Sequence, residues 1–482
     1  MDDIGALWPY ATAALDIAVS AAASAHAVLH KRDSRAAVGW VGLIWLVPIA
    51  GTLLYLWLGI NRIQRKARSL RAQRPHPEPQ EVLPECSAEA FSAACGPEGG
   101  HLASLAQLVG DVTKRSLVAG NRVEPLENGD EAYPAMLQAI EGASRSITLC
   151  TYIFNYDRAG RRFLAALARA AKRGVAVRVL VDDVGARYGW PPIPWTARRA
   201  GFPIVGFMHT LIPWRFRYFN LRLHRKIMVV DGATGFTGGM NISEGNCLEF
   251  RARDPIRDIH FRLTGPIVRQ LQAMFAEDWE FTTGEVLEGE PWFSETPADG
   301  PAVARGIPDG PDEDFEKLRL AIHGAIACAQ RSIIVVTPYF LPDAALITAL
   351  NVAAMRGVGV DIVLPEVNNL KMVKWASTAL LWQLIQRGCR VWRSPPPFDH
   401  GKLMLVDDAW TLLGSANWDP RSLRLNFEFN VECYDRALAA ALAARCRSVI
   451  ARSRPVGMAD VDGRPLPVKL RDGVARLFSP YL

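Results

Sequence analysis

Two long apolar stretches stand at the start of the chain, ahead of any strand-like pattern. Residues 36–60 carry no charged side chain, and as a helix they would extend about 37 Å, more than the ~30 Å hydrocarbon core of a bilayer. Residues 4–29 are alanine-rich and form a weaker candidate. A cleaved signal peptide is the alternative for this stretch, but Asp2 and Asp3 stand where a signal peptide carries basic residues. We therefore predict a transmembrane hairpin over 1–74, with spans at about 4–29 and 36–60.

The basic residues that flank these stretches predict how the hairpin is oriented. They are Lys31, Arg32 and Arg35 between the stretches, and Arg62, Arg65, Lys66, Arg68, Arg71 and Arg74 after the second one. Because the more basic flank stays in the cytoplasm, the large C-terminal body is predicted to be cytoplasmic. Pro75, Pro77 and Pro79 then open a polar stretch, so a linker is expected over 75–118.

The rest of the chain alternates between strand-like and helix-like patterns, and it does so twice. The runs ASRSITLCTYIF (143–154) and AQRSIIVVTPYF (329–340) are apolar and β-branched, as is typical of buried strands. Each is followed by a helix-forming stretch and then by Arg-Gly-Val and a second apolar run, from Arg173 and from Arg356. Strand, helix and strand in succession predict an α/β fold with two lobes. The lobes are assigned to residues 119–300 and 301–482.

The strongest signal is a further pair of matching segments, one in each predicted lobe. HRKIMVVDGATGFTGGMN (224–241) and HGKLMLVDDAWTLLGSAN (400–417) align without a gap. The shared residues with functional groups are His224, Lys226, Asp231 and Asn241 in the first copy, and His400, Lys402, Asp407 and Asn417 in the second. Each copy has one histidine, so a site that needs two must draw on both copies. We therefore expect the lobes to pack with pseudo-twofold symmetry around one site.

These residue types suit chemistry at a phosphodiester. Lysine and asparagine donate to phosphoryl oxygens and lysine neutralises their charge, while histidine acts as nucleophile or as general acid and base near neutral pH. Each histidine also needs a partner that fixes its tautomer. We expect Asp258 to serve His224 and Glu428 to serve His400, because each carboxylate follows the motif of its own lobe.

The two motif aspartates are expected to have a different role. Each H-x-K segment has the alternating pattern of a strand, which places the histidine and the lysine on one face. Asp231 and Asp407 follow the lysines at an odd spacing, so they are expected on the opposite face. A structural salt bridge or a turn is the role that this position predicts.

Composition narrows the class of protein further. Hydrophobic residues make up 50% of the chain and the mean hydropathy is +0.06, which favours a membrane-embedded stretch and excludes a disordered chain. The net charge of +6 suits an anionic surface such as lipid headgroups. The eight cysteines include no C-x-x-C pair, so neither a zinc site nor a disulfide framework is predicted, and a reduced compartment fits.

The duplicated H-x-K-x4-D motif resembles that of the phospholipase D superfamily, and the whole chain resembles the two-span bacterial cardiolipin synthases. The resemblance rests on GWVGLIWLVPIAGTLLYLWLGINR, ENGDEAY, TYIF, DIHFRLTGP, TPYFLPD, GSANWDPRSLRLNFE and the terminal LFSPYL. It implies two phospholipase D-like lobes behind a membrane hairpin in the bacterial inner membrane. It also implies the transfer of a phosphatidyl group from one phosphatidylglycerol to another, which gives cardiolipin and glycerol. Because the two lysines supply the positive charge that a metal would, no metal or other cofactor is expected.

The resemblance implies a role for each motif residue. His224 attacks the phosphorus and forms a phosphatidyl-histidine. His400 protonates the departing glycerol and then deprotonates the acceptor hydroxyl. The residues implied to hold the phosphate are Lys226, Lys402, Asn241 and Asn417. The resemblance also places the two lysines and the signature aspartates, Asp231 and Asp407, among the catalytic residues.

The residues alone leave the acceptor open. Water as the acceptor would make the protein a phospholipase D-type lipid hydrolase, and a nucleic-acid substrate would make it a nuclease. A membrane scaffold without catalysis is a third class. The apolar hairpin disfavours a nucleic-acid partner, two intact motifs disfavour a scaffold, and the oligomeric state is left open.

Overall fold

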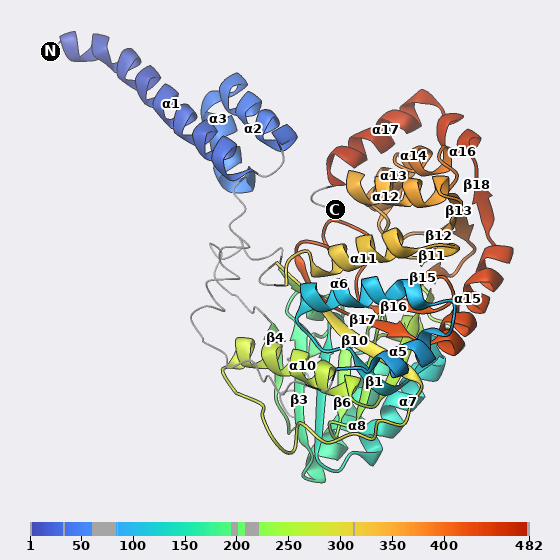
Figure 1. Cartoon of the computed structure of the whole chain (residues 1–482). Helices are drawn as coiled ribbons and strands as arrows, with labels where there is room; N and C mark the ends of the chain where they lie inside the picture. The colour runs from blue at the N-terminus through green and yellow to red at the C-terminus, as the bar shows by residue number, and fades with distance from the viewer. Residues whose placement is uncertain are drawn as a thin grey trace. The chain divides into compact units, whose positions relative to one another are not determined.

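The protein is described by a computed structural model of the whole chain (Figure 1). It divides into two compact units, residues 1–74 and 75–482. The residues that the structure describes are 2–31, 34–59, 83, 85–193, 201–207, 221–311 and 314–479.

The first unit is a hairpin of apolar helices. Its elements are α1 (Asp2–His30), α2 (Ser34–Leu46), α3 (Pro48–Leu54) and the π-helical turn η1 (Tyr55–Gly59). α1 packs against both α2 and α3. Ser20 Oγ lies 3.5 Å from Thr52 Oγ1, and His26 Nδ1 lies 2.7 Å from the hydroxyl of Tyr55. The predicted hairpin of helices is therefore present.

The two predicted spans differ in continuity. Among the described residues, Tyr10–His30 is the one helical stretch that is long and apolar enough to cross a membrane. The expectation of a continuous helix over 36–60 is corrected, because the helix breaks at Val47, just before Pro48. A proline has no N–H and disfavours helical geometry in the residue before it. The last residue of that predicted span, Ile60, lies outside the described residues.

The second unit contains every described strand, in two halves. The first half has β1 (Val118–Glu127), β2 (Ser146–Thr151), β3 (Ala176–Asp182), β4 (Ile204–Phe207), β6 (Ile227–Val230), β7 (Thr234–Gly238) and β9 (Ile259–Thr264). The second has β10 (Ala302–Asp309), β11 (Ser332–Val336), β12 (Gly359–Pro365), β13 (Arg390–Ser394), β15 (Leu403–Val406), β16 (Trp410–Gly414), β17 (Asn426–Tyr434) and β18 (Arg454–Val456). The strands predicted in both copies of the repeat are confirmed as β2, β3, β11 and β12.

Strand order is the same in both halves. It runs β1-β9-β7-β6-β2-β3-β4 in the first half and β10-β17-β16-β15-β11-β12-β13 in the second, with β18 added at the edge. β1 and β10 pair antiparallel, with Val118 opposite Ala304, and join the halves into one mixed sheet. Two antiparallel strands at the centre of a repeated order are the arrangement that a pseudo-twofold axis produces. The predicted α/β fold with two related lobes is confirmed.

Helices cover the sheet in both halves (Figure 1). They are α5 (Ala88–Cys95), α6 (Ala103–Thr113), α7 (Asn128–Gly142), α8 (Arg158–Lys172), α10 (Ile267–Thr283), α11 (Lys317–Cys328), α12 (Ala344–Met355), α13 (Lys371–Thr378), α14 (Trp382–Ile385), α15 (Arg436–Ala451), α16 (Met458–Asp462) and α17 (Leu466–Leu477).

α8 and α12 begin and end with the same kinds of residue in the two copies of the repeat. Asp157 and Asp343 cap the N-termini, accepting from the N–H of Gly160 and Leu346. Both helices end at the Arg-Gly-Val signal. There Gly174 and Gly357 have φ of +91°, a left-handed conformation that glycine adopts without steric strain.

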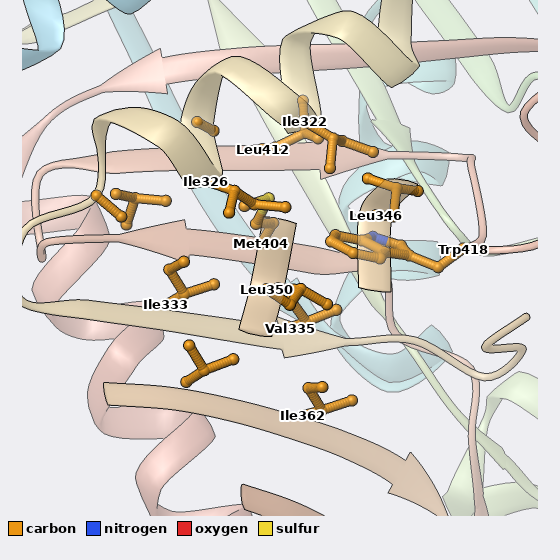
Figure 2. Packing of buried hydrophobic residues seen from close by; sticks show 14 of the residues in the cluster. Ile322, Ile326, Ile333, Val335, Leu346, Leu350, Ile362, Met404, Leu412 and Trp418 are labelled. Carbon is orange, nitrogen blue, oxygen red and sulfur yellow. The ribbon is translucent and has the colours of Figure 1, made fainter. Parts of the chain in front are cut away.

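The core of the second half lies between its helices and its sheet. Ile322 and Ile326 from α11 and Leu346 and Leu350 from α12 are buried against the apolar face of the strands (Figure 2). The strand side chains in this cluster include Ile333, Val335, Ile362, Met404 and Leu412. The side chains of β11 and β12 on this face are apolar, as the β-branched runs of the sequence predict.

The stretch expected to be a linker, 75–118, is folded over its described part from Glu85. α6 packs against α11, and its Leu105 and Val109 are fully buried in the core of the second half. Arg305 of β10 ties α6 to the sheet by donating to the carbonyl oxygen of Ala106 at 2.5 Å. Apolar residues at helical spacing therefore make this segment part of the body.

Candidate active site

Two short strand pairings join the two halves of the body near the H-x-K segments. They are β5 (Arg222–Leu223) with the start of β17, and β8 (Ile256–Arg257) with β14 (Phe398–Asp399), both parallel. The N–H of His224 donates to the carbonyl oxygen of Phe427 at 2.9 Å, and the N–H of His400 donates to that of Arg257 at 2.7 Å. In both cases the acceptor immediately precedes a carboxylate in the sequence.

The histidine–carboxylate pairs therefore cross between the halves. His224 Nδ1 lies 2.9 Å from Glu428 Oε2, and His400 Nδ1 lies 2.8 Å from Asp258 Oδ2. We expected the opposite pairing, Asp258 with His224 and Glu428 with His400, and that expectation is wrong. It assumed that each carboxylate serves its own lobe, whereas the parallel pairings place each histidine against the strand of the other lobe.

Both lysines lie beside their histidines. The H-x-K segments are extended connections between strands, not strand interiors as expected. The Nζ of Lys226 donates to the carbonyl oxygen of His224, and that of Lys402 to the carbonyl oxygen of His400, each at 2.6 Å. Lys402 Nζ also lies 3.0 Å from Nδ1 and 3.1 Å from Nε2 of the His400 ring. In each copy of the motif, the lysine ammonium therefore lies next to the histidine of the same copy.

One glycine shows how closely the halves approach. A Cβ atom added to Gly239 would lie 2.7 Å from an oxygen of Asp258 and 3.1 Å from Nζ of Lys402. The position that matches Gly239 in the second copy is Ser415. Its hydroxyl donates to Glu428 at 2.5 Å. The two carboxylates are therefore held differently: one is supported by a serine hydroxyl, and the other leaves space only for a glycine.

Burial sets the protonation of the site. It lowers the pKa of His224 well below its usual value, and that of His400 to about 4, with the neighbouring lysines adding to both effects. Both rings are therefore neutral near pH 7. Burial raises the pKa of Glu428 to about 7. Burial would also raise the pKa of Asp258, but the nearby charges of Lys402 and His400 outweigh it and leave the pKa lowered.

The two motif asparagines are fixed by their own lobes. Asn241 Oδ1 accepts from the N–H of Ile153 at 3.1 Å, and Asn417 Nδ2 donates to the hydroxyl of Ser422 at 3.2 Å. The amide nitrogen of Asn241 has no hydrogen-bond partner among the described residues, so it is available as a donor. Their part in holding a phosphate stays a prediction.

The motif aspartates lie away from the histidines, at the far ends of β6 and β15. Asp231 has φ of +53° and accepts the backbone N–H groups of residues 144–146 at 2.8–2.9 Å. Asp407 has φ of +55° and accepts those of residues 330–332 at 2.7–2.8 Å. His101 Nε2 lies 2.7 Å from Asp407 as well. The turn role predicted from the odd spacing is confirmed. The structure does not bring these two residues to the histidines, so it disagrees with the catalytic role that the resemblance implied for them.

Replacing Asp231 or Asp407 with alanine should therefore lower stability rather than chemistry. Three N–H groups lose their acceptor, so we expect the free energy of unfolding to fall by about 2–4 kcal/mol. Asparagine tolerates left-handed geometry and keeps one oxygen, so the asparagine variants should lose less. Urea unfolding and the specific activity of the folded fraction are the measurements. A normal unfolding curve with abolished activity would contradict the turn role.

One buried arginine was missed by the sequence analysis. Arg225, inside the first H-x-K segment, places its Nη1 2.5 Å from Asp278 and donates from Nε to the carbonyl oxygen of Glu428 at 3.0 Å. It is fully buried, so it fixes the strand that carries the carboxylate. The second copy has Gly401 at this position, and this difference in an otherwise matching motif was the available signal.

Two tyrosines were also missed. The ring centroid of Tyr152 lies 5.1 Å from that of His224, and that of Tyr339 lies 6.2 Å from that of His400. They follow β2 and β11, in the runs TYIF and TPYF, where the sequence analysis predicted strands and named no site residue. Both tyrosines therefore lie just past the carboxyl ends of these strands, beside the histidines.

The lysines make substrate binding depend on pH. Burial lowers the pKa of Lys226 to about 7 and that of Lys402 to about 8. A lysine is charged below its pKa and neutral above it, so attraction for a phosphodiester anion should weaken as pH rises through this range. We expect kcat/KM for dihexanoyl phosphatidylglycerol to fall between pH 7 and pH 9. Lys402→Arg keeps its charge in this range and should show a smaller fall, whereas a flat wild-type profile would contradict the charge argument.

The described residues contain no cluster of three or more His, Cys, Asp or Glu side chains that could hold a metal ion. The positive charge that faces the site is carried by Lys226 and Lys402. This arrangement fits the expectation that the lysines neutralise the phosphate.

Sequence comparison adds independent findings. A family described as "Cardiolipin synthase, PLD-like domain" matches residues 136–279 and 322–450, and one described as "Phospholipase_D-nuclease N-terminal" matches residues 18–59. The cardiolipin synthase of Geobacillus sp. (strain WCH70) is 32% identical over 94% of this chain and 90% of its own length. The major cardiolipin synthase ClsA of Bacillus subtilis is 31% identical over 94% of this chain and 95% of its own length. Cardiolipin synthase A of Pseudomonas putida KT2440 is 31% identical over 95% of each.

Comparison with solved structures supports the fold. The crystal structure of phosphatidylserine synthase from Haemophilus influenzae superposes with a TM-score of 0.57 at 16% identity. It covers 75% of this chain and 95% of the other.

Proposed function

Since the chain belongs to the cardiolipin synthase family of the phospholipase D superfamily, we propose that its site joins two phosphatidylglycerol molecules into cardiolipin and releases glycerol. The observation that carries this proposal is the crossed pair of histidines. Each is backed by a buried carboxylate of the other lobe and stands beside a buried lysine. Such a site can hold one phosphodiester between a nucleophile and a general acid.

The first half of the reaction forms a bond to His224. Its Nε2 attacks the phosphorus, and the bond from phosphorus to the glycerol oxygen breaks. His400 donates its proton to that oxygen, so glycerol leaves as a neutral molecule. Phosphate binding supplies the negative charge that raises the pKa of His400, so the ring can carry this proton when substrate is present.

In the second step of the reaction, His400 acts as a base and His224 is the leaving group. His400, now neutral, removes the proton from the terminal hydroxyl of a second phosphatidylglycerol. The hydroxyl oxygen attacks the phosphorus, and the bond from phosphorus to His224 breaks. Lys226, Lys402, Asn241 and Asn417 hold the phosphoryl oxygens in both steps.

The hydrogen bonds of the two rings support this division of roles. Among the described residues, Nε2 of His224 has no hydrogen-bond partner, so its lone pair is available for attack. Nε2 of His400 lies 3.1 Å from the ammonium of Lys402, which competes for that lone pair. The same cation beside His400 would favour proton release to the leaving group.

The membrane arrangement is part of the proposal. α1 and the α2–α3 segment both lie in the bacterial inner membrane, so the protein is multi-pass, and the body containing the site faces the cytoplasm. The continuous apolar helix α1 and the basic residues after the second segment support this. A proline-broken helix is compatible with a membrane, because neighbouring helices can satisfy the freed backbone groups.

One assay tests the proposed reaction. The full chain is reconstituted into vesicles with labelled phosphatidylglycerol, and the lipid products are resolved with and without EDTA. Cardiolipin in equal amounts in both arms is expected, because lysines supply the charge at the phosphate. Phosphatidic acid as the main product would favour a lipid hydrolase instead. Loss of activity in EDTA that a divalent ion restores would contradict the lysine argument.

A further inference from the structure

An exposed apolar stripe runs along α17, far from the sequence motifs. Leu466, Leu470, Val474 and Leu477 are 68%, 60%, 54% and 76% exposed. They recur every three or four residues, so they share one face of the helix. The opposite face is buried at Ala475, where α17 packs against α13. In Figure 1, α17 lies at the edge of the second unit, outside α13 and α14.

Basic residues border this stripe on both sides. At 100° per residue, Lys469 and Arg476 lie along one border and Arg471 along the other. Neither Lys469 nor Arg476 forms an ion pair with a described residue. Asp472, the one acidic residue of the helix, is buried and bound to Arg471 at 2.8 Å. Arg471 also stacks over the ring of Trp375 at 4.4 Å. The exposed surface of α17 is therefore apolar in the middle, with its unpaired positive charge along the border of Lys469 and Arg476.

The stripe is connected to the active site through one loop. Tyr339, whose ring faces His400, donates its hydroxyl hydrogen to Asn369 at 2.8 Å. The loop that holds Asn369 also exposes the apolar residues Val367 and Leu370, by 50% and 47%. It leads directly into α13, the helix on which α17 packs. Two exposed apolar residues therefore lie in the segment that joins the partner of Tyr339 to the helix on which α17 packs.

We propose that α17 lies in the interface of an anionic bilayer, with its apolar stripe among the acyl chains and with Lys469 and Arg476 on lipid phosphates. A helix with an apolar face and flanking basic residues binds such a surface by burying the apolar face and by attracting the anionic headgroups. Only the choice of phosphatidylglycerol as the lipid rests on the proposed function. Docked in this way, the loop of Asn369 would stand at the membrane surface, so that lipid could enter the site without crossing water.

Aspartate in the stripe tests this surface without touching the site. Leu470→Asp is compared with Val286→Asp, an apolar residue of similar exposure, 54%, in the first lobe. Activity of the full chain is measured on vesicles of phosphatidylglycerol and phosphatidylcholine, and on monomeric dihexanoyl phosphatidylglycerol. We expect Leu470→Asp to lose about tenfold on vesicles and to match wild type on the monomeric lipid. Equal activity of Leu470→Asp and wild type on vesicles would overturn the docking surface.

The same measurements separate this inference from the proposed reaction. If wild type makes no cardiolipin from the monomeric lipid or from vesicles, the proposed function fails. A photo-crosslinking experiment still tests the membrane surface in that case. The photo-crosslinker benzoylphenylalanine replaces Leu470 in the full chain, reconstituted in the same vesicles. A lipid adduct is expected. Adducts to helices α1–α3 or to a second copy of the chain would instead assign the stripe to a protein contact and overturn the proposal.

Discussion

His224→Ala should lose both turnover and covalent labelling by phosphatidylglycerol, whereas His400→Ala should lose turnover but retain the label. The first variant has no nucleophile to bond to phosphorus. The second keeps its nucleophile but must expel glycerol without a proton and then activate the acceptor unaided. General acid–base help is worth about a hundred- to ten-thousand-fold per step, so cardiolipin formation should nearly vanish in both variants.

The measurement is a quench of each variant after exposure to phosphorus-labelled phosphatidylglycerol. The retained label should be acid-labile and stable in alkali, as a phosphoramidate is. His323→Ala, a half-buried histidine on α11, is the matched control and should behave as wild type. Label retained by His224→Ala and absent from His400→Ala would reverse the assignment. Full activity in either site variant would refute the two-histidine mechanism.

Exchanging the carboxylates for amides should affect the histidine of the opposite lobe. Glu428→Gln removes the charge beside His224, so covalent labelling should slow. Asp258→Asn removes the charge beside His400, so labelling should persist while cardiolipin formation falls. A carboxylate that orients a catalytic histidine contributes about 10²- to 10⁴-fold, and we expect losses in this range for turnover in both variants.

Double variants show which pairs act together. Asp258→Asn should add little to the loss already caused by His400→Ala, because the two residues act as one unit. Glu428→Gln combined with His400→Ala should instead reduce the remaining label. Asp361→Asn, a carboxylate on β12 that pairs with Arg390, serves as the control for the substitution itself. Coupling of Asp258 to His224 rather than to His400 would contradict the crossed arrangement.

The sequence by itself determined the two-lobed fold and the motif residues. Duplicated strand, helix and strand patterns predicted the related halves, since β-branched runs and a glycine after each helix are local signals. The lysine beside each histidine and the turn role of Asp231 and Asp407 also followed from local spacing. These features depend on residues a few positions apart, where backbone geometry leaves few alternatives.

Only the tertiary structure decided which carboxylate faces which histidine. Asp258 and Glu428 were both identified, but the sequence could not tell that β5 pairs with β17 and β8 with β14. The histidine–carboxylate pairs that these strands form are 204 and 142 positions apart in the sequence, and they depend on how the lobes face each other. The contact of Arg225 with Asp278, 53 positions apart within the first lobe, and the packing of α6 on α11 were missed because they too join segments that are distant in the sequence.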